Sequence, residues 1–88
     1  MNWTVEFDAA AHRDLQTLDH AIQQRLVRFL RTRIADTESP RRLGKPLKGE
    51  KAGFWRYRVG DYRLICLLEE NRHCVVVMAI GHRRDIYR

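Results

Sequence analysis

The chain has 88 residues, of which 44% are hydrophobic, and this is enough for one domain with a modest core. Its 17 Lys and Arg residues outnumber the 11 Asp and Glu residues, which gives a formal net charge of +6. No apolar run approaches the ~18 residues of a membrane span, and the first residues lack the basic and apolar regions of a signal peptide. We predict a single domain over residues 1–88 that resides in the cytoplasm and has no membrane partner.

The positive charge is concentrated in one part of the chain. Residues 41–63 hold 8 basic and 2 acidic side chains, whereas residues 1–40 hold 5 basic and 6 acidic ones. A concentrated basic field favours a polyanion or an acidic protein as partner. Cys66 and Cys74 are too few for a disulfide framework, and no spacing suggests a metal ligand set, so neither a metal nor another cofactor is expected.

The first half of the chain predicts a strand followed by two helices. Apolar and polar residues alternate over residues 2–7, which is typical of a strand. Asp8 and Asp19 are the expected N-cap residues of the two helices, and Ser39-Pro40 is the expected end of the second. The second helix has an apolar stripe that should face the core: Ile22, Leu26, Phe29, Leu30 and Ile34.

The second half predicts a basic loop and a three-stranded antiparallel meander. Residues 38–53 are rich in Pro, Gly and Lys, which is typical of a loop. The stretch FWRYRVGDYRLI, residues 54–65, predicts two strands, and an apolar run predicts a third from about residue 73 to 81. The predicted fold class is therefore α+β: a strand, a two-helix hairpin and then the meander.

The register of the predicted hairpin decides which side chains share a face. Gly60-Asp61 matches a two-residue turn, and this turn places Arg58 opposite Arg63. Opposite partners share a face of the sheet. One face is apolar and can pack on the helices: Trp55, Tyr57, Val59, Tyr62, Leu64, Cys66 and Leu68. The other face has apolar residues at one end and arginines at the turn end: Phe54, Ile65, Leu67, Arg56, Arg58 and Arg63.

The end of the third strand should arrive beside these arginines. One corner of the sheet would then gather six side chains: Arg56, Arg58, Arg63, His82, Arg83 and Tyr87. Either this is a solvated arginine face, or the missing anion is a ligand. Guanidinium groups hold phosphate in a bidentate way and can stabilise the charge of a pentacoordinate transition state. Cleavage of RNA by its own 2′-hydroxyl needs only a base and an acid in addition, and His82, with a reference pKa near ~6.5, is of a suitable type.

The order of elements, the motif LKG…FWRYRVGDYRLI and the closing VVVMAIGHRRDIY resemble the RelE family of bacterial toxins over nearly the whole chain. The resemblance implies a small α/β fold similar to microbial ribonucleases, entry into the ribosomal A site and metal-free cleavage of the mRNA there. It also implies an acidic, partly disordered, RelB-like antitoxin that holds the toxin inactive. The expected partners are thus this antitoxin, the ribosome and mRNA.

By position, the resemblance implies catalytic roles for Arg56 and Arg58 in the first hairpin strand, Arg63 in the next strand, and Arg83 and Tyr87 after the last. RelE has lysine where this chain has the first two arginines. Arginine holds phosphate but is a poor proton donor or acceptor, so these positions are expected to bind rather than to transfer protons.

Two further roles are predicted. RelE has lysine where His82 lies, and other relatives use a nearby histidine as a base, so the base is His82, Tyr87 or both at different steps. The basic loop is expected to bind RNA through five side chains: Arg41, Arg42, Lys45, Lys48 and Lys51.

Two other functions are compatible with the same fold. ParE relatives bind and poison DNA gyrase without acting as enzymes, and a plain RNA-binding module is a third reading. A shared fold does not decide among them. The gathered arginines favour mRNA cleavage, because a gyrase-binding protein does not need them.

Overall fold

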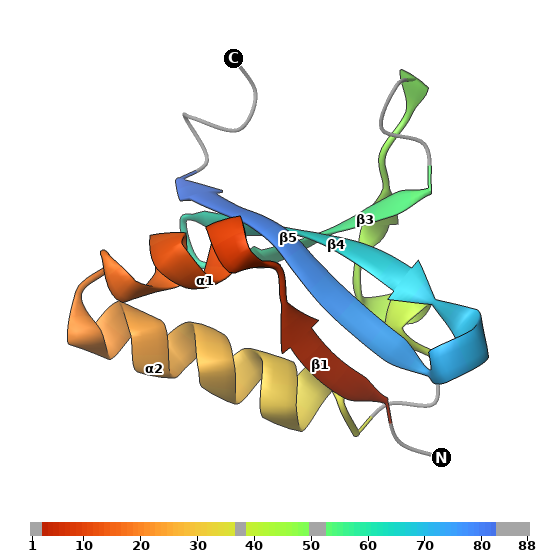
Figure 1. Cartoon of the computed structure of the whole chain (residues 1–88), viewed down its shortest axis with the longest axis horizontal. Helices are drawn as coiled ribbons and strands as arrows, with labels where there is room; N and C mark the ends of the chain where they lie inside the picture. Colours follow the sequence, from red (N-terminus) through yellow and green to blue (C-terminus); the bar gives the residue numbers. More distant parts are fainter. Residues whose placement is uncertain (1–2, 37–38, 50–52, 83–88) are drawn as a thin grey trace.

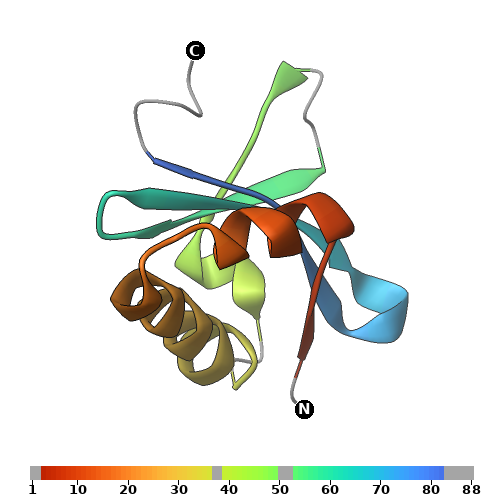
Figure 2. The same cartoon turned by 60° about the vertical axis from the view of Figure 1, so that its left-hand side comes forward.

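Two helices lie against one face of a five-stranded sheet in the computed structural model of the chain (Figures 1 and 2). The structure describes residues 3–36, 39–49 and 53–82. The elements in chain order are β1 (Thr4–Phe7), α1 (Ala9–Gln16), α2 (His20–Phe29), η1 (Leu30–Ile34), η2 (Pro40–Leu43), β2 (Lys45–Pro46), β3 (Phe54–Val59), β4 (Tyr62–Glu69), η4 (Glu70–Arg72) and β5 (Cys74–His82). The strand order is β1-β5-β4-β3-β2, with β1 parallel to β5 and the other neighbours antiparallel. The α+β class and the meander are confirmed, and no helix of the described residues is long and apolar enough to cross a membrane.

The two predicted helix caps differ in the structure. The Asp8 carboxylate accepts a hydrogen bond from the backbone N–H of Ala10 at 3.2 Å, as expected of a capping side chain. Asp19 also occupies an N-cap position, but its side chain makes no capping hydrogen bond. Its backbone carbonyl accepts the N–H of Gln23 at 2.9 Å instead. The first cap is thus confirmed in full, and the second only in position.

The second helix ends in a wider turn, η1, that keeps its apolar stripe inward. The N–H of Ala35 donates to the carbonyl of Leu30, five residues back, at 2.8 Å. Leu26, Leu30 and Ile34 are buried, as the sequence predicted. The prediction that Ser39-Pro40 ends the helix is wrong, because η1 already ends at Ile34 and Pro40 begins the short helix η2. The carbonyl of Ala35 accepts the N–H of Trp3 at 2.9 Å, which ties this helix end to β1.

The β3–β4 hairpin has the predicted register, with Arg58 opposite Arg63 and Tyr57 opposite Leu64. Gly60 opens the turn with a φ of 60°, a conformation that glycine adopts without strain. The apolar face of the hairpin packs on the helices, and its members join the core cluster or lie against it.

Strand β5 contains an irregularity that the sequence did not predict. Ile65 pairs with Ala79 while the next residue, Cys66, pairs with Val77, so Met78 has no opposite partner. An extra residue of this kind shifts the alternation of side chains by one position. Val77 and Ile80, three residues apart, therefore both face the helices and belong to the core.

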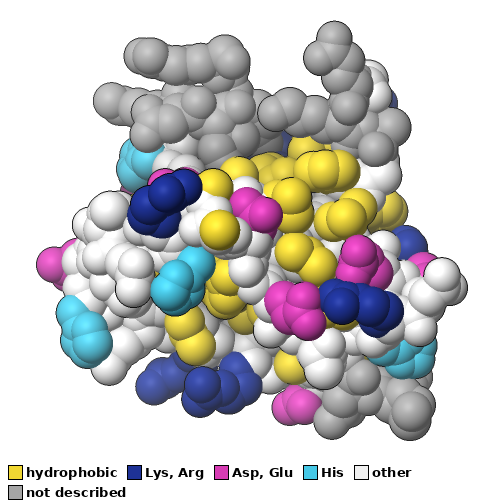
Figure 3. Space-filling model, viewed as in Figure 1, with side chains coloured by type: hydrophobic (Ala, Val, Ile, Leu, Met, Phe, Trp, Pro, Cys, Tyr) yellow, Lys and Arg dark blue, Asp and Glu magenta, His cyan; other side chains and the backbone are white. Residues whose placement is uncertain are grey.

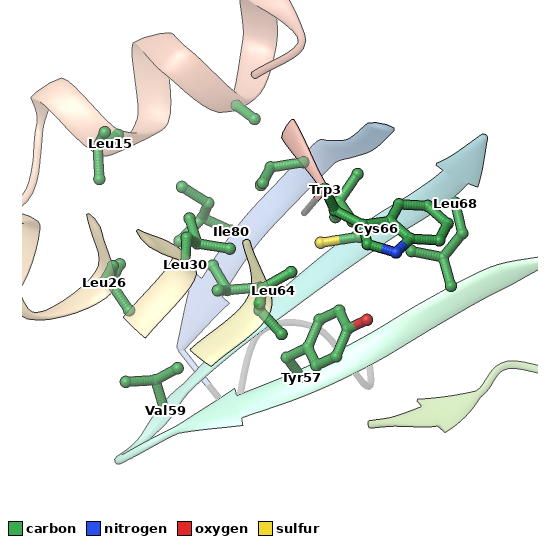
Figure 4. Close-up of a cluster of buried hydrophobic side chains, with 14 residues drawn as sticks. Trp3, Leu15, Leu26, Leu30, Tyr57, Val59, Leu64, Cys66, Leu68 and Ile80 are labelled. Atoms are coloured by element: carbon green, nitrogen blue, oxygen red, sulfur yellow. The ribbon is translucent and has the colours of Figure 1, made fainter. Parts of the chain in front are cut away.

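The core lies between the helices and the sheet. Figure 4 shows Leu30, Ile80 and Leu64 close together near its centre, with Leu26 and Val59 to their left. Burying one such side chain contributes roughly 1.5–3 kcal/mol. The core comprises Trp3, just before β1, and residues from both helices, η1 and the strands β3, β4 and β5: Ala11, Leu15, Leu26, Leu30, Ile34, Tyr57, Val59, Leu64, Cys66, Leu68, Val75, Val77 and Ile80.

The segment predicted as a loop, residues 38–53, contains regular structure. After η2 the chain forms the short strand β2, in which Lys45 pairs with Arg56 of β3. Gly44 allows this approach, since a Cβ atom there would lie 2.4 Å from the carbonyl oxygen of Arg56 and 2.8 Å from the ring of Tyr57. The single glycine therefore lets the basic segment add an edge strand to the sheet.

Candidate functional site

The face of the sheet without helices carries a row of cations across three strands. Lys45 of β2 lies opposite Arg56 of β3, and Arg58 of β3 lies opposite Arg63 of β4. Opposite partners share a face, and alternate residues of β3 share it too. The Cα atoms of neighbouring residues in this row are roughly 5–7 Å apart. We call these four residues the cation row.

A pocket of about 330 Å³ lies at one end of the cation row. Its lining includes the cations Arg42, Lys45, Arg56 and Arg58. Arg42, Lys45 and Arg58 are exposed, whereas Arg56 is half-buried. Guanidinium groups stay charged at any working pH, so this pocket is suited to hold a phosphate or another polyvalent anion.

Arg63, at the other end of the row, is buried, with only 6% of its surface exposed. Its cross-strand neighbour Arg58 is exposed. A charge held away from solvent acts more strongly on a nearby anion, because salt and water screen it less. The sequence predicted the position of Arg63 beside Arg58 but gave no sign that it would be buried.

His82 lies on the face of the sheet that the helices cover, so the structure does not bring its side chain together with the arginines. The end of β5 arrives beside Arg63, as predicted, but Gly81 is the residue opposite Arg63, and His82 is opposite Tyr62. The two rings of this pair meet edge to face with centroids 5.6 Å apart. The extra residue Met78 causes this placement, because it reverses the alternation over the end of β5. Within the described residues, no group of three His, Cys, Asp or Glu side chains is placed to hold a metal ion.

The five predicted RNA-binding residues divide into four groups. Arg42 and Lys45 line the pocket with the arginines of β3. Arg41 does not, since its guanidinium forms an ion pair with Glu70 and lies over the Trp55 ring, 5.4 Å from the centroid.

Lys48 is exposed beyond the end of β2 and is not among the residues that line the pocket. Lys51, Arg83 and Tyr87 lie outside the described residues. Their predicted roles therefore stay predictions.

Two aromatic side chains on the helix side of β3 hold the basic segment in place, and sequence reasoning missed this role. The hydroxyl of Tyr57 donates to the carbonyl of Pro40 at 2.8 Å, and the indole N–H of Trp55 donates to the carbonyl of Arg41 at 3.2 Å. Burial raises the pKa of Tyr57, so its hydroxyl stays a donor over the working pH range. Strand β3 thus fixes residues 40–41 with one face and presents Arg56 with the other.

Apolar side chains continue the helix-free face beyond the cation row. Figure 3 shows hydrophobic side chains gathered to the upper right of its centre, over β4 and β5. At the far border of this face, Arg72 forms ion pairs with Glu6 at 2.9 Å and Glu69 at 2.8 Å. The apolar residues are half-buried or buried, although no helix in the described part of the chain covers them: Phe54, Ile65, Leu67, Val76 and Ala79.

A small α+β domain with arginines on the helix-free face of its sheet agrees with the resemblance to RelE-like toxins in the sequence. The family model described as the ParE toxin of the type II toxin–antitoxin system parDE matches residues 5–87. The chain therefore belongs to this family of toxins. The match includes the helices α1 and α2 and the strand β5.

Known relatives agree with this assignment. The chain is 39% identical to toxin RelG of Mycobacterium tuberculosis over 88 residues, which is 100% of this chain and 99% of that protein. It is 36% identical to toxin RelE of the same organism over 84 residues, covering 96% of this chain and 84% of that protein.

Solved structures show the same fold. The toxin–antitoxin complex RelBE2 of Mycobacterium tuberculosis matches with a TM-score of 0.86 at 35% identity, covering 97% of this chain and 95% of that one. A mutant of E. coli toxin RelE in the free state matches with a TM-score of 0.76 at 21% identity, covering 98% and 88%. The chain is a RelE-family toxin of the type II toxin–antitoxin class.

Proposed function

We propose that this toxin cleaves mRNA in the ribosomal A site and so inhibits translation and growth. The observation that carries the proposal is the cation row on the helix-free face, from Lys45 through Arg56 and Arg58 to Arg63. Single-stranded RNA offers a phosphate at every nucleotide, and a row of cations can hold several of them. We place the reaction in the cytoplasm, where ribosomes work.

The proposed reaction needs no group that the chain does not supply. A base removes the proton of the 2′-hydroxyl, the 2′-oxygen bonds to the adjacent phosphorus, and the bond from phosphorus to the 5′-oxygen breaks as an acid protonates that oxygen. The products are a 2′,3′-cyclic phosphate and a 5′-hydroxyl. Arg56, Arg58 and Arg63 hold the phosphate and stabilise its extra negative charge in the transition state. Arg83 is a further phosphate ligand in this proposal.

The proton transfers are assigned to His82, Tyr87 or both. The imidazole of His82 packs on Tyr62, on the face of the sheet away from the arginines. We therefore propose Tyr87 as the base. We expect His82→Gln to keep ribosome-dependent cleavage within about tenfold of the parent, since general acid–base groups at the reacting atoms contribute roughly 10²–10⁴-fold. A loss of that larger size would show that His82 reaches the substrate.

Dependence on the ribosome follows from the small number of groups that can transfer protons. With few groups to shuttle protons, most of the rate must come from holding the RNA in a reactive geometry. The toxin should therefore cut mRNA on programmed ribosomes and leave the same mRNA intact in free solution. A message with a 2′-deoxynucleotide at the cleavage position should resist. Equal cutting of free RNA, or products that end in a 5′-phosphate, would contradict the proposal.

We also propose that an acidic, RelB-like antitoxin binds and inhibits this toxin. The positive charge of residues 41–63 supports such a partner. The neighbouring apolar patch also supports it, and consists of Phe54, Ile65, Leu67, Val76 and Ala79. Solved relatives include complexes named RelB–RelE and RelBE2. The association rate should fall strongly with added salt if charge steers the encounter.

A second function has one observation in its favour, because the matching family model is named for ParE toxins. In that case the purified chain would inhibit DNA gyrase in a supercoiling assay and leave mRNA on ribosomes intact. The cation row favours cleavage, so we expect no inhibition of gyrase.

A further inference from the structure

The guanidinium of Arg41 is held by two side chains, and neither of them lines the pocket. It forms an ion pair with Glu70 of η4, which is 29 residues later in the chain. It also lies over the ring of Trp55, with 5.4 Å between the guanidinium carbon and the ring centroid. The π-system of an indole attracts a cation in this position. A guanidinium beside a carboxylate attracts a phosphate less strongly, because the two opposite charges largely cancel at a distance.

The backbone of Arg41 is held at the same place. The indole N–H of Trp55 donates to the carbonyl of Arg41 at 3.2 Å, so the indole contacts this residue both with its ring and with its N–H. The residues that follow form one wall of the pocket, from Arg42 to Lys45, and Lys45 then pairs with Arg56 of β3. The position of Arg41 therefore sets where this wall of the pocket begins.

Glu70 is in a turn that is itself fixed to the sheet. The N–H of His73 donates to the carbonyl of Glu70 at 3.2 Å and closes the turn, with a φ of 49° at His73. The ring of His73 stacks on the buried ring of Trp3, with centroids 5.0 Å apart. Arg72 of the same turn forms an ion pair with Glu6 of β1 at 2.9 Å. Glu70 thus presents its carboxylate to Arg41 from a backbone that is tied to β1.

We propose that Glu70 and Arg41 are positioning residues for the RNA-binding pocket. Their ion pair, which we call the tether, holds the start of the pocket wall and keeps Arg42 and Lys45 beside the arginines of β3. The inference rests on the RNA binding of the proposed function and names two residues that prepare the site without contacting the phosphate. Glu70 is then an acidic side chain that promotes the binding of a polyanion.

The sign of this effect separates the tether from ordinary electrostatics. Removal of a carboxylate near a cationic site normally strengthens the binding of RNA, because it removes a repulsion. If Glu70 holds Arg41 in place, its removal weakens the binding instead. Substitution of Arg41 does not make this distinction, since RNA affinity falls whether the guanidinium holds the wall or contacts the RNA itself.

The test is the affinity of a short single-stranded RNA oligonucleotide, measured by fluorescence anisotropy and expressed per folded molecule. Glu70→Gln should weaken binding by about three- to fivefold, the size expected for the loss of one ordered ion pair at the surface. Glu69→Gln is the matched control, because it removes the same charge from the adjacent residue and also breaks an ion pair, that with Arg72. It should leave the affinity unchanged or slightly higher.

A double variant tests whether Glu70 acts through Arg41. In a chain that already carries Arg41→Gln, the substitution Glu70→Gln should cause no further weakening, since the tether is already broken. A further weakening of similar size would show that Glu70 acts without Arg41 and would overturn the proposal.

The tether also has a readout that needs no RNA. The chain contains two tryptophans, and their indole N–H signals can be followed separately by nitrogen-15 NMR. In Glu70→Gln the indole N–H of Trp55 should exchange with water about three- to fivefold faster, because its acceptor at Arg41 is less firmly held. The Trp3 signal should stay unchanged, and it reports on the turn through the stacked ring of His73.

The outcomes separate the tether from the proposed function. A parent chain that binds no RNA would contradict the proposed function, whereas unchanged exchange at Trp55 in Glu70→Gln would contradict the tether. Unchanged or stronger RNA binding by Glu70→Gln would also overturn the tether, and would make Arg41 an RNA ligand that Glu70 masks. Equal weakening by Glu69→Gln would assign the effect to the turn as a whole and not to the ion pair with Arg41.

Discussion

On one face of the β3–β4 hairpin, Tyr57 and Leu64 are fully buried against the core, whereas on the other face Arg58 and Arg63 lie opposite each other. The two pairs are neighbours in sequence, and they lie on opposite faces because successive side chains of a strand point to opposite faces. One step along the chain thus separates a residue that stabilises the fold from a residue that we assign to RNA. The two faces should therefore respond independently to substitution.

The comparison also explains how the hairpin tolerates like charges. Two arginines directly opposite each other cost a few tenths of a kcal/mol to about 1 kcal/mol. Burial of the leucine and tyrosine next to them contributes roughly 1.5–3 kcal/mol for each side chain. The apolar face outweighs the repulsion, so the register holds even though one of its pairs is unfavourable.

The largest expected effect is on the apolar face. Leu64 is fully buried, so Leu64→Ala should lower the free energy of unfolding by about 2–5 kcal/mol. Cleavage per folded molecule should stay close to that of the parent, because Leu64 points away from the cation row. Urea unfolding and ribosome-dependent cleavage measure the two quantities on the same preparation.

Leu43→Ala is the matched control for stability, since Leu43 is 36% exposed and its truncation should cost little. If Leu64→Ala lost cleavage in the fraction that remains folded, the two faces would not be independent. The comparison between them would then fail.

The next effect is on the cationic face. Arg63→Gln should lower ribosome-dependent cleavage by about 100-fold or more, because it removes a buried charge that we assign to the transition state. The rate is expressed per folded molecule, from urea unfolding of the same sample. Arg33→Gln removes an exposed arginine of η1 and should leave cleavage unchanged. Equal activity of the two variants would make Arg63 a structural residue and would favour the gyrase or RNA-binding alternatives.

Much of this comparison could be predicted from the sequence. The turn at Gly60-Asp61 fixes the register, and alternation then assigns each residue of the hairpin to a face. The face of His82 could not be predicted, because it depends on the extra residue Met78 in β5. Nothing in the local pattern of a uniformly apolar strand marks which residue is unpaired.

Tertiary contacts decide the remaining differences. Strand β2 contains a proline and is two residues long, so its propensity does not predict a strand. It forms because Trp55 and Tyr57 hold the carbonyls of Arg41 and Pro40 and so bring the basic segment against β3. These are contacts between residues far apart in sequence, which a periodic pattern does not reveal.

Tyr57→Phe tests the link between the two faces. It removes the buried hydrogen bond to Pro40 and leaves that carbonyl without the hydroxyl, at a cost of about 1–3 kcal/mol. Burial raises the pKa of Tyr57, so the hydroxyl is protonated below and around neutral pH and loses its proton only in strong alkali. The stability difference between parent and variant should therefore be constant from about pH 6 to 9.

Tyr57→Phe should also weaken the binding of a short RNA oligonucleotide, since Arg42 and Lys45 are in the segment that Tyr57 holds. Tyr62→Phe is the control, because Tyr62 is half-buried at the turn and away from that segment. Equal RNA affinity of both variants would show that the pocket keeps its shape without the hydrogen bond.

The smallest expected effect has the opposite sign. Arg58 is exposed and lies opposite Arg63, so Arg58→Ala should raise the free energy of unfolding by about 0.3–1 kcal/mol through relief of like-charge repulsion. The gain should shrink in 1 M salt, where the Debye length is about 3 Å. Arg13→Ala removes a cation from the last turn of α1, where a cation is favourable, and should be neutral or slightly destabilising.

Cleavage should fall in Arg58→Ala and not in Arg13→Ala. One result for the stability of Arg58→Ala would contradict the expected gain: a loss of stability that does not change with salt. That result would mean that the two arginines do not repel each other in the free toxin. The cation row would then cost the fold no stability.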